Sequence, residues 1–311
     1  MPVEEAVRKA LPRLSAETLP EFRQPGFGGV PGTKAPDLTA GGKVRVEERL
    51  IPGPQNAPDV TLLILSPVDD RGPKAGIYHI HGGGMVTGYR HAGVHTLLPY
   101  VAEGNAVVVS VEYRLAPENP DPAPVEDCYT GLAWVARNAE ELGINPQRLI
   151  VTGASAGGGL AAGTAPLARD RGFPEFTHQV LVCPMFDDCF QSHSARMLDG
   201  EGICDRNDNV FHWTALLGDR RGTDDVSIYA APARAEDLTG LPRTYVDVGS
   251  TETFRDEAIA YAQRLSEAGI SVDLHMWGGG FHGFDMVAAH TAISRASNAT
   301  RDEFFRRALE E

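Results

Sequence analysis

Basic residues, long apolar runs and paired cysteines are all scarce in this chain of 311 residues. Lys and Arg total 28 against 42 Asp and Glu, which gives a formal net charge of −14 at pH 7. Such an acidic chain is poorly suited to nucleic acid and to anionic membrane surfaces, so we expect neither as a partner. No apolar run approaches membrane-spanning length, and Met1–Ala10 lacks the apolar core of a signal peptide. We therefore expect a cytoplasmic protein.

Cysteine is too sparse to form a disulfide framework. The four cysteines have no CxxC spacing and no regular pattern; they are Cys128, Cys183, Cys189 and Cys204. Free thiols in a reducing compartment are the simplest interpretation. A Cys183–Cys189 disulfide is the alternative.

Hydrophobic residues make up 42% of the chain and charged residues 23%, a balance typical of a globular protein with a sizeable core. The candidate strands are Val44–Ile51, Val60–Leu65, Gly76–Ile80, Ala106–Glu112, Arg148–Thr152, Gln179–Val182, Thr244–Val248 and Val272–Met276. Apolar residues recur every three or four positions over 125–142 and 254–268, as in helices. This alternation predicts an α/β fold with a mostly parallel, eight-stranded, doubly wound sheet, and one antiparallel pairing near its start.

Two segments depart from this alternation. Residues 1–42 are rich in Pro and Gly, and residues 186–225 combine a polar loop with an expected helix over Asp208–Leu217. Both are suited to form a cap over the carboxyl edge of the sheet. We therefore expect the catalytic core to consist of residues 43–185 and 226–311.

The stretch Gly153–Gly157 reads Gly-Ala-Ser-Ala-Gly and lies between an expected strand and an expected helix. This is the context of a nucleophile elbow, in which Ser155 occupies a sharp turn and the Ala156 N–H can face an oxyanion. The alternatives are a turn that only packs and a phosphate-binding loop. No Lys follows the glycines after Gly157, so a Walker A loop is excluded.

The stretch His81–Gly84, His-Gly-Gly-Gly, follows another expected strand. Glycines without Cβ atoms let the main-chain N–H groups of Gly83 and Gly84 approach a carbonyl oxygen. Together with Ser155, such donors form the minimal apparatus for acyl transfer.

Two histidine pairs could instead suggest a metal. His79 and His81 share one strand face, and His91 and His95 are four residues apart. No third ligand is apparent for the first pair, and the glycines would have no purpose in a metal site. The second pair is more simply a solvated or packed helix face, so we expect no metal and no cofactor.

A serine nucleophile needs a base and an acid, which in this arrangement follow it in the order Ser, acid, His. His282 follows the last expected strand and is the predicted base; His275 lies within that strand and is the rival. Glu252 leaves the strand before it and is the predicted acid. Asp247, within a strand, and Asp256, within a helix, are the alternatives.

These motifs resemble the hormone-sensitive-lipase family of α/β-hydrolases, in particular its bacterial carboxylesterases. Five ordered stretches carry the resemblance: His81–Gly84, Tyr113–Glu118, Gly153–Gly157, Glu252–Glu257 and His282–Phe284. The resemblance covers nearly the whole chain and implies the α/β-hydrolase fold, a helical cap with an N-terminal part, and a homodimer.

The chain departs from the family pattern at two positions. Ala154 stands where such proteins commonly have an acidic residue or Thr, and Glu252 stands where Asp is more common. Glutamate is chemically competent as the orienting acid, so the departures bear on the geometry of the site.

The resulting functional prediction is a serine carboxylesterase that acts on short- to medium-chain, small-molecule esters through an acyl-enzyme. An amidase or a lactonase could use the same residues, and a non-catalytic binding protein on this fold is a further alternative. The aromatic residues that could line an acyl pocket or fill the core of the cap are Phe22, Phe27, Phe186, Phe211 and Trp213.

Overall fold

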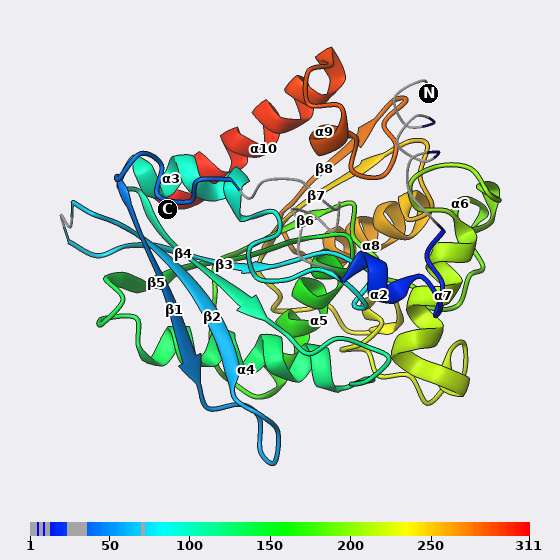
Figure 1. The fold of residues 1–311 in the computed structure, drawn as a ribbon, viewed down its shortest axis with the longest axis horizontal. Coiled ribbons are helices and arrows are strands. Elements are labelled where there is room, and N and C mark those ends of the chain that lie inside the picture. Colours follow the sequence, from blue (N-terminus) through cyan, green and yellow to red (C-terminus); the bar gives the residue numbers. More distant parts are fainter. Residues whose placement is uncertain (1–4, 6–8, 10–12, 24–35, 70–71) are drawn as a thin grey trace.

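The apolar segments of the sequence form one eight-stranded sheet in a computed structural model that describes residues 5, 9, 13–23, 36–69 and 72–311. All eight expected strands are present, most of them slightly longer than predicted (Figure 1). The strands are β1 (Val44–Ile51), β2 (Val60–Pro67), β3 (Lys74–Ile80), β4 (Ala106–Glu112), β5 (Ile144–Ala154), β6 (His178–Val182), β7 (Arg243–Gly249) and β8 (Val272–Trp277).

The strand order is β1-β2-β4-β3-β5-β6-β7-β8. The pairings from β4 to β8 are parallel, as predicted. The prediction of one antiparallel pairing was wrong, because β2 pairs antiparallel with both β1 and β4. A short connection returns the chain from β1 into β2, so β2 alone runs against the other strands and is antiparallel to each of its neighbours.

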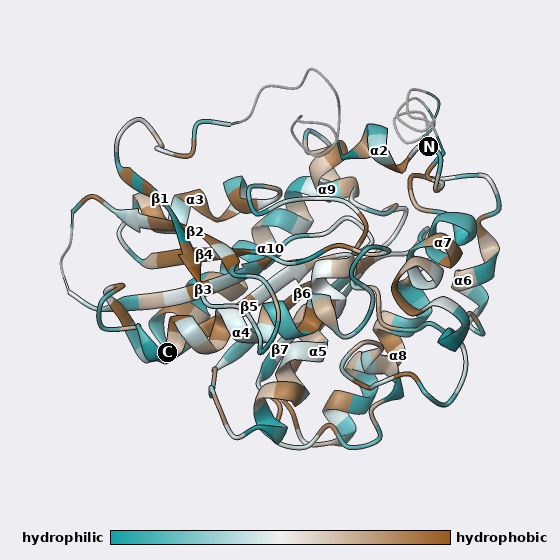
Figure 2. Ribbon diagram, turned by 60° about the horizontal axis from the view of Figure 1, so that its bottom comes forward, coloured by the Kyte–Doolittle hydropathy of each residue, from teal (hydrophilic) through white to brown (hydrophobic). Residues whose placement is uncertain are grey.

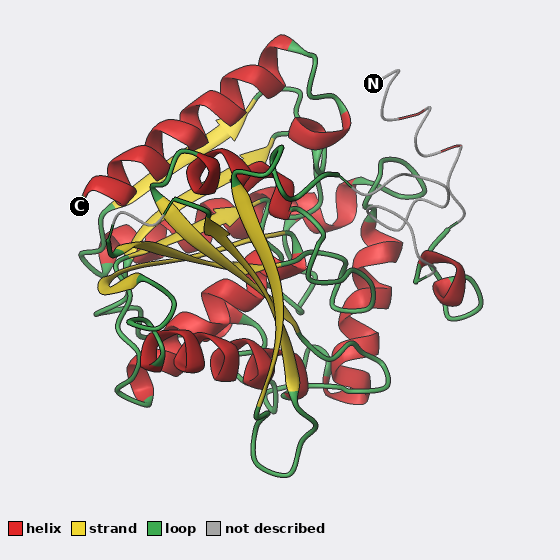
Figure 3. Ribbon diagram, turned by 60° about the vertical axis from the view of Figure 1, so that its left-hand side comes forward, coloured by secondary structure: helices red, strands yellow, loops and turns green. Residues whose placement is uncertain are grey.

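Helices cover both faces of the sheet (Figure 3). The α-helices are α2 (Leu19–Phe22), α3 (Leu98–Ala102), α4 (Ala123–Arg137), α5 (Ala156–Asp170), α6 (His193–Met197), α7 (Arg206–Leu217), α8 (Arg255–Glu267), α9 (Phe284–Val287) and α10 (Ala292–Glu310). Short 3-10 helices are η2 (Val94–Leu97), η3 (Gly218–Arg220) and η4 (Pro232–Arg234). None of the helices within the described residues is long and apolar enough to cross a membrane.

Two apolar clusters fill the space between sheet and helices. The larger cluster packs one sheet face against α4, α5 and α8, and the second packs the other face against α3 and α10. Along β2, Leu62 and Ile64 belong to the first cluster, and Leu63 and Leu65 to the second. Figure 2 shows this hydrophobic strand inside the molecule. A strand buried on both faces explains the near-continuous apolar runs of the sequence.

The helices α2, α6 and α7 gather at one end of the molecule (Figure 1). An ion pair between Arg13 and Asp205 joins the N-terminal segment to the inserted segment. Asp205 also forms a capping box with Asp208, which explains why α7 begins at Arg206, two residues before the predicted start. Leu38, by contrast, is buried in the cluster beside α3 and α10.

Candidate active site

Ser155 occupies a sharp turn between β5 and α5. Its backbone has φ 57° and ψ −123°, a region that non-glycine residues rarely adopt. The turn is possible because its flanking residues lack side chains: a Cβ on Gly153 would lie 2.2 Å from the carbonyl oxygen of Gly157, and one on Gly157 would lie 2.1 Å from that of Ile80. The Ser155 N–H donates to Val182 O at 2.8 Å. Backbone sterics and this hydrogen bond therefore hold the serine in the predicted elbow geometry.

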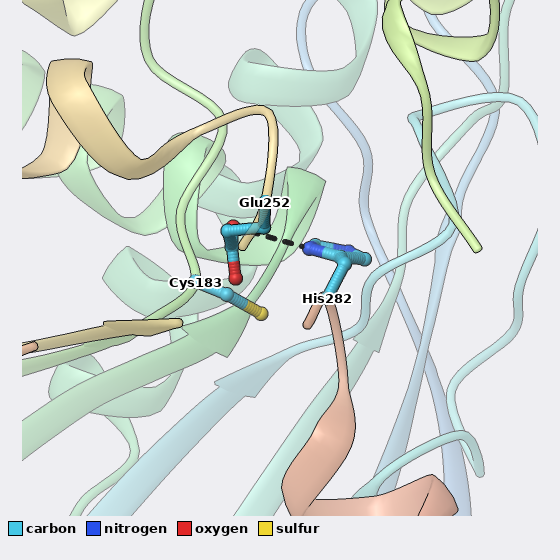
Figure 4. Close-up of side chains that lie close together, drawn as sticks. All are labelled: Cys183, Glu252 and His282. Atoms are coloured by element: carbon cyan, nitrogen blue, oxygen red, sulfur yellow. Dashed lines mark hydrogen bonds and ion pairs between the residues drawn. The ribbon is translucent and has the colours of Figure 1, made fainter. Parts of the chain in front are cut away.

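Loops after β7 and β8 bring an acid and a base to this serine. His282 Nε2 lies 3.0 Å from Ser155 Oγ. On the other side of the ring, His282 Nδ1 lies 3.4 Å from Glu252 Oε1, the contact drawn in Figure 4. The second carboxylate oxygen of Glu252 accepts the N–H of Gly249 at 3.3 Å. The structure thus brings together the three side chains that the sequence predicted. The histidine–carboxylate contact is long for a hydrogen bond, as in many sites without substrate.

Burial and neighbouring negative charge act in opposite directions on the pKa of His282. Glu252 is 1% exposed and the His282 side chain 14%. Burial by itself lowers the pKa of His282, and the negative charge of the nearby Glu252 carboxylate raises it; the net direction is upward. Since burial raises the pKa of Cys183, Cys183 is a neutral thiol near pH 7, and Glu252 supplies the negative charge there.

The glycine stretch after β3 lies against the elbow. A Cβ on Gly82 would lie 3.5 Å from the Cβ of Ser155. Gly83 and Gly84 have φ values of +114° and +63°, which favour glycine. In the described part of the chain, the N–H groups of Gly83, Gly84 and Ala156 donate to no protein acceptor. The glycine stretch and the start of α5 therefore offer main-chain donors near the elbow that are suited to stabilise an oxyanion.

Packing of His81 against Tyr113 stabilises the start of this glycine stretch. Its ring stacks on Tyr113 with centroids 4.1 Å apart, and the Tyr113 hydroxyl donates to His81 O at 2.9 Å. The next residue, Arg114, donates to both carboxylate oxygens of the buried Asp127 at 2.8 Å. Burial, the largest influence, lowers the pKa of His81 to about 4, so the ring is neutral at pH 7. The Tyr113–Glu118 motif thus buttresses the glycine stretch.

The rival acids and base have other partners. Asp247 accepts from Arg301 at 2.8 Å, and Asp256 accepts the N–H of Ser194, in α6, at 2.8 Å. His275 stacks among aromatic rings at the edge of the sheet. These side chains stabilise the fold around the site, and the structure leaves Glu252 and His282 beside the serine.

The histidine pairs considered as metal ligands do not assemble a site. His79 Nδ1 lies 2.9 Å from Ser110 Oγ, and burial, followed by nearby histidines, lowers the pKa of His79 to about 3. Among the described residues, two groups of three or more side chains have the spacing of metal ligands, and neither includes His79, His81, His91 or His95.

The sequence did not predict two residues at this site. The ring of His212, in α7, packs closely against Gly84: a Cβ built on Gly84 would lie 2.1 Å from a ring carbon. Burial, and then His282, lowers the pKa of His212 to about 4. Cys183 follows β6 and lies beside Glu252 and His282 (Figure 4). The strand order could have located Cys183, because β6 lies between β5 and β7; no local signal identifies His212.

All four cysteines are free thiols, so the alternative of a Cys183–Cys189 disulfide is not adopted. Among the aromatic candidates, Phe186 and Trp213 are fully buried in the larger core cluster. Phe211 is partly buried against the same cluster and Phe22 is half-buried, while Phe27 lies outside the described residues.

Comparison with known proteins places this chain in a family. A family model described as α/β hydrolase fold matches residues 77–286. The carboxylesterase NlhH of Mycobacterium tuberculosis is 35% identical over 238 residues, which cover 75% of this chain and 73% of that protein. Esterase LipI of the same species is 33% identical over 264 residues, covering 83% and 80% of the two chains.

Solved structures agree with this assignment. A bacterial heroin esterase superposes with a TM-score of 0.88 at 38% identity, covering 99% of this chain and 98% of that chain. Esterase LipW from Mycobacterium marinum superposes with a TM-score of 0.79 at 32% identity, covering 88% and 85%. The α/β-hydrolase fold implied by the motifs is therefore confirmed. This chain belongs to the hormone-sensitive-lipase family of α/β-hydrolases.

Proposed function

We propose that this protein is a serine carboxylesterase that hydrolyses short- to medium-chain carboxylic esters through an acyl-enzyme. The observation that carries the proposal is the hydrogen-bonded series from Ser155 through His282 to Glu252. Relatives named as esterases or carboxylesterases, matched over most of their length, support it.

In the first step His282 Nε2 accepts the proton of Ser155 Oγ while that oxygen attacks the ester carbonyl carbon. The negative charge that develops on the carbonyl oxygen is stabilised by the N–H groups of Gly83, Gly84 and Ala156. The tetrahedral intermediate then collapses, and the departing alkoxide takes the proton from His282. The products of this step are a free alcohol and an ester of Ser155.

In the second step water replaces the alcohol. His282 accepts a proton from the water, whose oxygen attacks the acyl-enzyme, and returns that proton to Ser155 Oγ as the carboxylic acid leaves. Glu252 keeps the imidazole in the tautomer with Nδ1–H and stabilises the imidazolium in both steps. These residues complete the reaction with no cofactor.

We assign residues 1–42 and 186–225 to a cap over a core of residues 43–185 and 226–311, with the exception of Leu38, which packs into the core beside α3 and α10. Two contacts in the described parts support this division. His212, in α7, packs on Gly84, and the hydroxyl of Thr253, next to the proposed acid, donates to Cys204 O at 2.8 Å. The inserted segment therefore touches both the oxyanion donors and the acid loop.

The substrate is a small ester, and the partner is a second copy of the chain. The strand β8 lies at the edge of the sheet and exposes Leu274 by 39% and Met276 by 54%, features that support a homodimer. The free thiols support a cytoplasmic location. Sedimentation of the protein tests the dimer, which a monomer at all concentrations would exclude.

The decisive experiment is hydrolysis of p-nitrophenyl esters from acetate to laurate by the wild type and by Ser155→Ala. We expect the highest kcat/KM with short to medium acyl chains and a loss of about 10⁴-fold or more in the variant. Activity that survives in Ser155→Ala would remove the serine as nucleophile. An ester compared with its matched amide shows which bond the site prefers.

A further inference from the structure

The proposed reaction leaves one buried thiol beside the triad without a task. Cys183 follows β6, and its side chain is turned toward those of Glu252 and His282, as Figure 4 shows. One ligand atom from each residue, the sulfur, a carboxylate oxygen and a ring nitrogen, lies within 4.8 Å of the other two. The three side chains come from loops after three adjacent strands, so the sheet holds them in one place.

The chemistry of this group is that of a zinc site. Zn²⁺ binds thiolate sulfur, imidazole nitrogen and carboxylate oxygen at about 2.0–2.3 Å, with tetrahedral geometry. Ligands at those distances are roughly 3.3–3.8 Å apart, so shifts of about 1 Å in side-chain position would seat the ion. A thiolate also selects soft and borderline cations over Mg²⁺ and Ca²⁺.

We propose that Cys183, Glu252 and His282 bind one Zn²⁺ ion and that this ion inhibits the hydrolase. The ion bonds to Cys183 Sγ, to a carboxylate oxygen of Glu252 and to His282 Nδ1. The thiol proton goes to solvent. Zinc displaces the Nδ1 proton of the His282 imidazolium to solvent as well, which leaves a neutral imidazole with its hydrogen on Nε2.

Inhibition follows from the position of that proton. With hydrogen on Nε2, His282 has no lone pair to accept the proton of Ser155, and the zinc ion takes the place of the contact with Glu252. Nucleophilic attack therefore stops while the fold is unchanged. The inhibition rests on the proposed role of His282 in catalysis, whereas the binding of the metal does not.

A second cluster provides an internal control. Asp187, Asp188 and Cys189 also have the spacing of metal ligands. There, however, Arg234 lies 2.6 Å from a carboxylate oxygen of Asp188 and 3.3 Å from Cys189 Sγ. A guanidinium already neutralises these groups, so this cluster is the weaker candidate for a cation.

The ion reaches its site through the histidine. Cys183 is 6% exposed and Glu252 1%. The side chain of His282 is 14% exposed, which gives an entering ion its first ligand. We therefore expect inhibition to develop slowly after mixing and to be reversed by a chelator.

The first test titrates chelator-treated enzyme with ZnCl₂ and expresses each rate relative to the same variant without zinc. We expect inhibition of the wild type and of Cys189→Ala at the same concentrations. Cys183→Ser should need at least about tenfold more zinc, because it lacks the thiolate ligand. Equal inhibition of Cys183→Ser and the wild type would overturn the proposal, and so would a wild type that zinc does not inhibit.

The second test measures binding without catalysis. Co²⁺ replaces Zn²⁺ in Ser155→Ala, and thiolate-to-metal charge transfer is recorded in the near ultraviolet. We expect the band in Ser155→Ala and its loss in the double variant with Cys183→Ser. An absent band, or one that persists without Cys183, contradicts the site even if the protein proves not to be an esterase. A band from Cys183 in a protein that hydrolyses no ester would contradict the proposed function alone.

Discussion

The serine turn and the inserted segment meet at one site but are held in place by different forces. The turn at Ser155 depends on the backbone: glycines at 153 and 157 leave no room for a Cβ, and the serine has a positive φ. The segment 186–225 depends on side chains from distant parts of the chain, such as the Arg13–Asp205 ion pair. The first is strongly specified by local residue type, and the second by long-range pairing. Substitutions in the two regions should therefore differ in size and kind.

The largest effect is expected from Gly157→Ala in the turn. The new Cβ would lie 2.1 Å from the carbonyl oxygen of Ile80, so the elbow must open or β3 must shift. We expect loss of activity together with destabilisation of about 1–3 kcal/mol or more. Urea unfolding and ester hydrolysis measure the two effects, and Gly278→Ala, at an exposed turn where a Cβ would meet nothing within 4 Å, is the control. Normal activity in Gly157→Ala would show that backbone sterics do not hold the serine.

Glu252→Gln should reduce activity next most strongly and change its pH dependence. His282 must be neutral to act as a base, and its raised pKa means that activity rises with pH above the ordinary histidine range near 6.5. Removal of the carboxylate charge lowers this pKa, so the acid limb of kcat/KM should move to lower pH. The rate itself should fall by up to about 10⁴-fold, because the amide can favour the wrong tautomer.

The matched control for that profile is Asp256→Asn, on the neighbouring helix. Its carboxylate accepts from Ser194 and Arg255 and makes no contact with His282. We expect its acid limb to stay where the wild type has it. A limb that moves with Asp256→Asn and not with Glu252→Gln would reverse the assignment of the acid.

A smaller effect is expected from His212→Ala in the inserted segment. The ring packs on Gly84 and is more than nine-tenths buried, so its loss opens space beside the oxyanion donors. We expect preference among p-nitrophenyl esters to move toward longer chains, with kcat/KM for the best substrate lowered by about tenfold or less. His91→Ala, whose ring lies near Glu48, is the control. Unchanged chain-length preference would place His212 outside the pocket wall.

The smallest effect is expected from Arg13→Ala. The Arg13 side chain is 46% exposed, so its ion pair with Asp205 should contribute less than about 1 kcal/mol to stability. Asp205→Ala should cost more, about 1–2 kcal/mol, because it also removes the N-cap of α7. Chemical unfolding of both variants measures the difference, and equal effects would mean that the ion pair, and not the cap, carries the contribution of Asp205.

The sequence predicted the bounds of the strands better than it predicted how the strands pair. Strands such as β4 were predicted at their observed bounds, because a β-branched run bounded by polar residues is a local signal. The second antiparallel pairing was missed, because it joins β2 to β4, a strand that follows only after 38 intervening residues. The catalytic roles of Ser155, Glu252 and His282 remain predictions, but their proximity is a feature of the structure.

By itself, the sequence determined the residue types that we propose for acyl transfer and the order in which they follow the strands. The turns around Ser155 and after His81 leave no room for a Cβ, so they require glycine, and this requirement can be read directly from the residue types. Only the tertiary structure decided which side chains gather around His282. Cys183 comes there because β6 lies between β5 and β7, and His212 because α7 folds back over Gly84. These contacts join residues far apart in the chain, and packing in three dimensions selects them without leaving a local pattern.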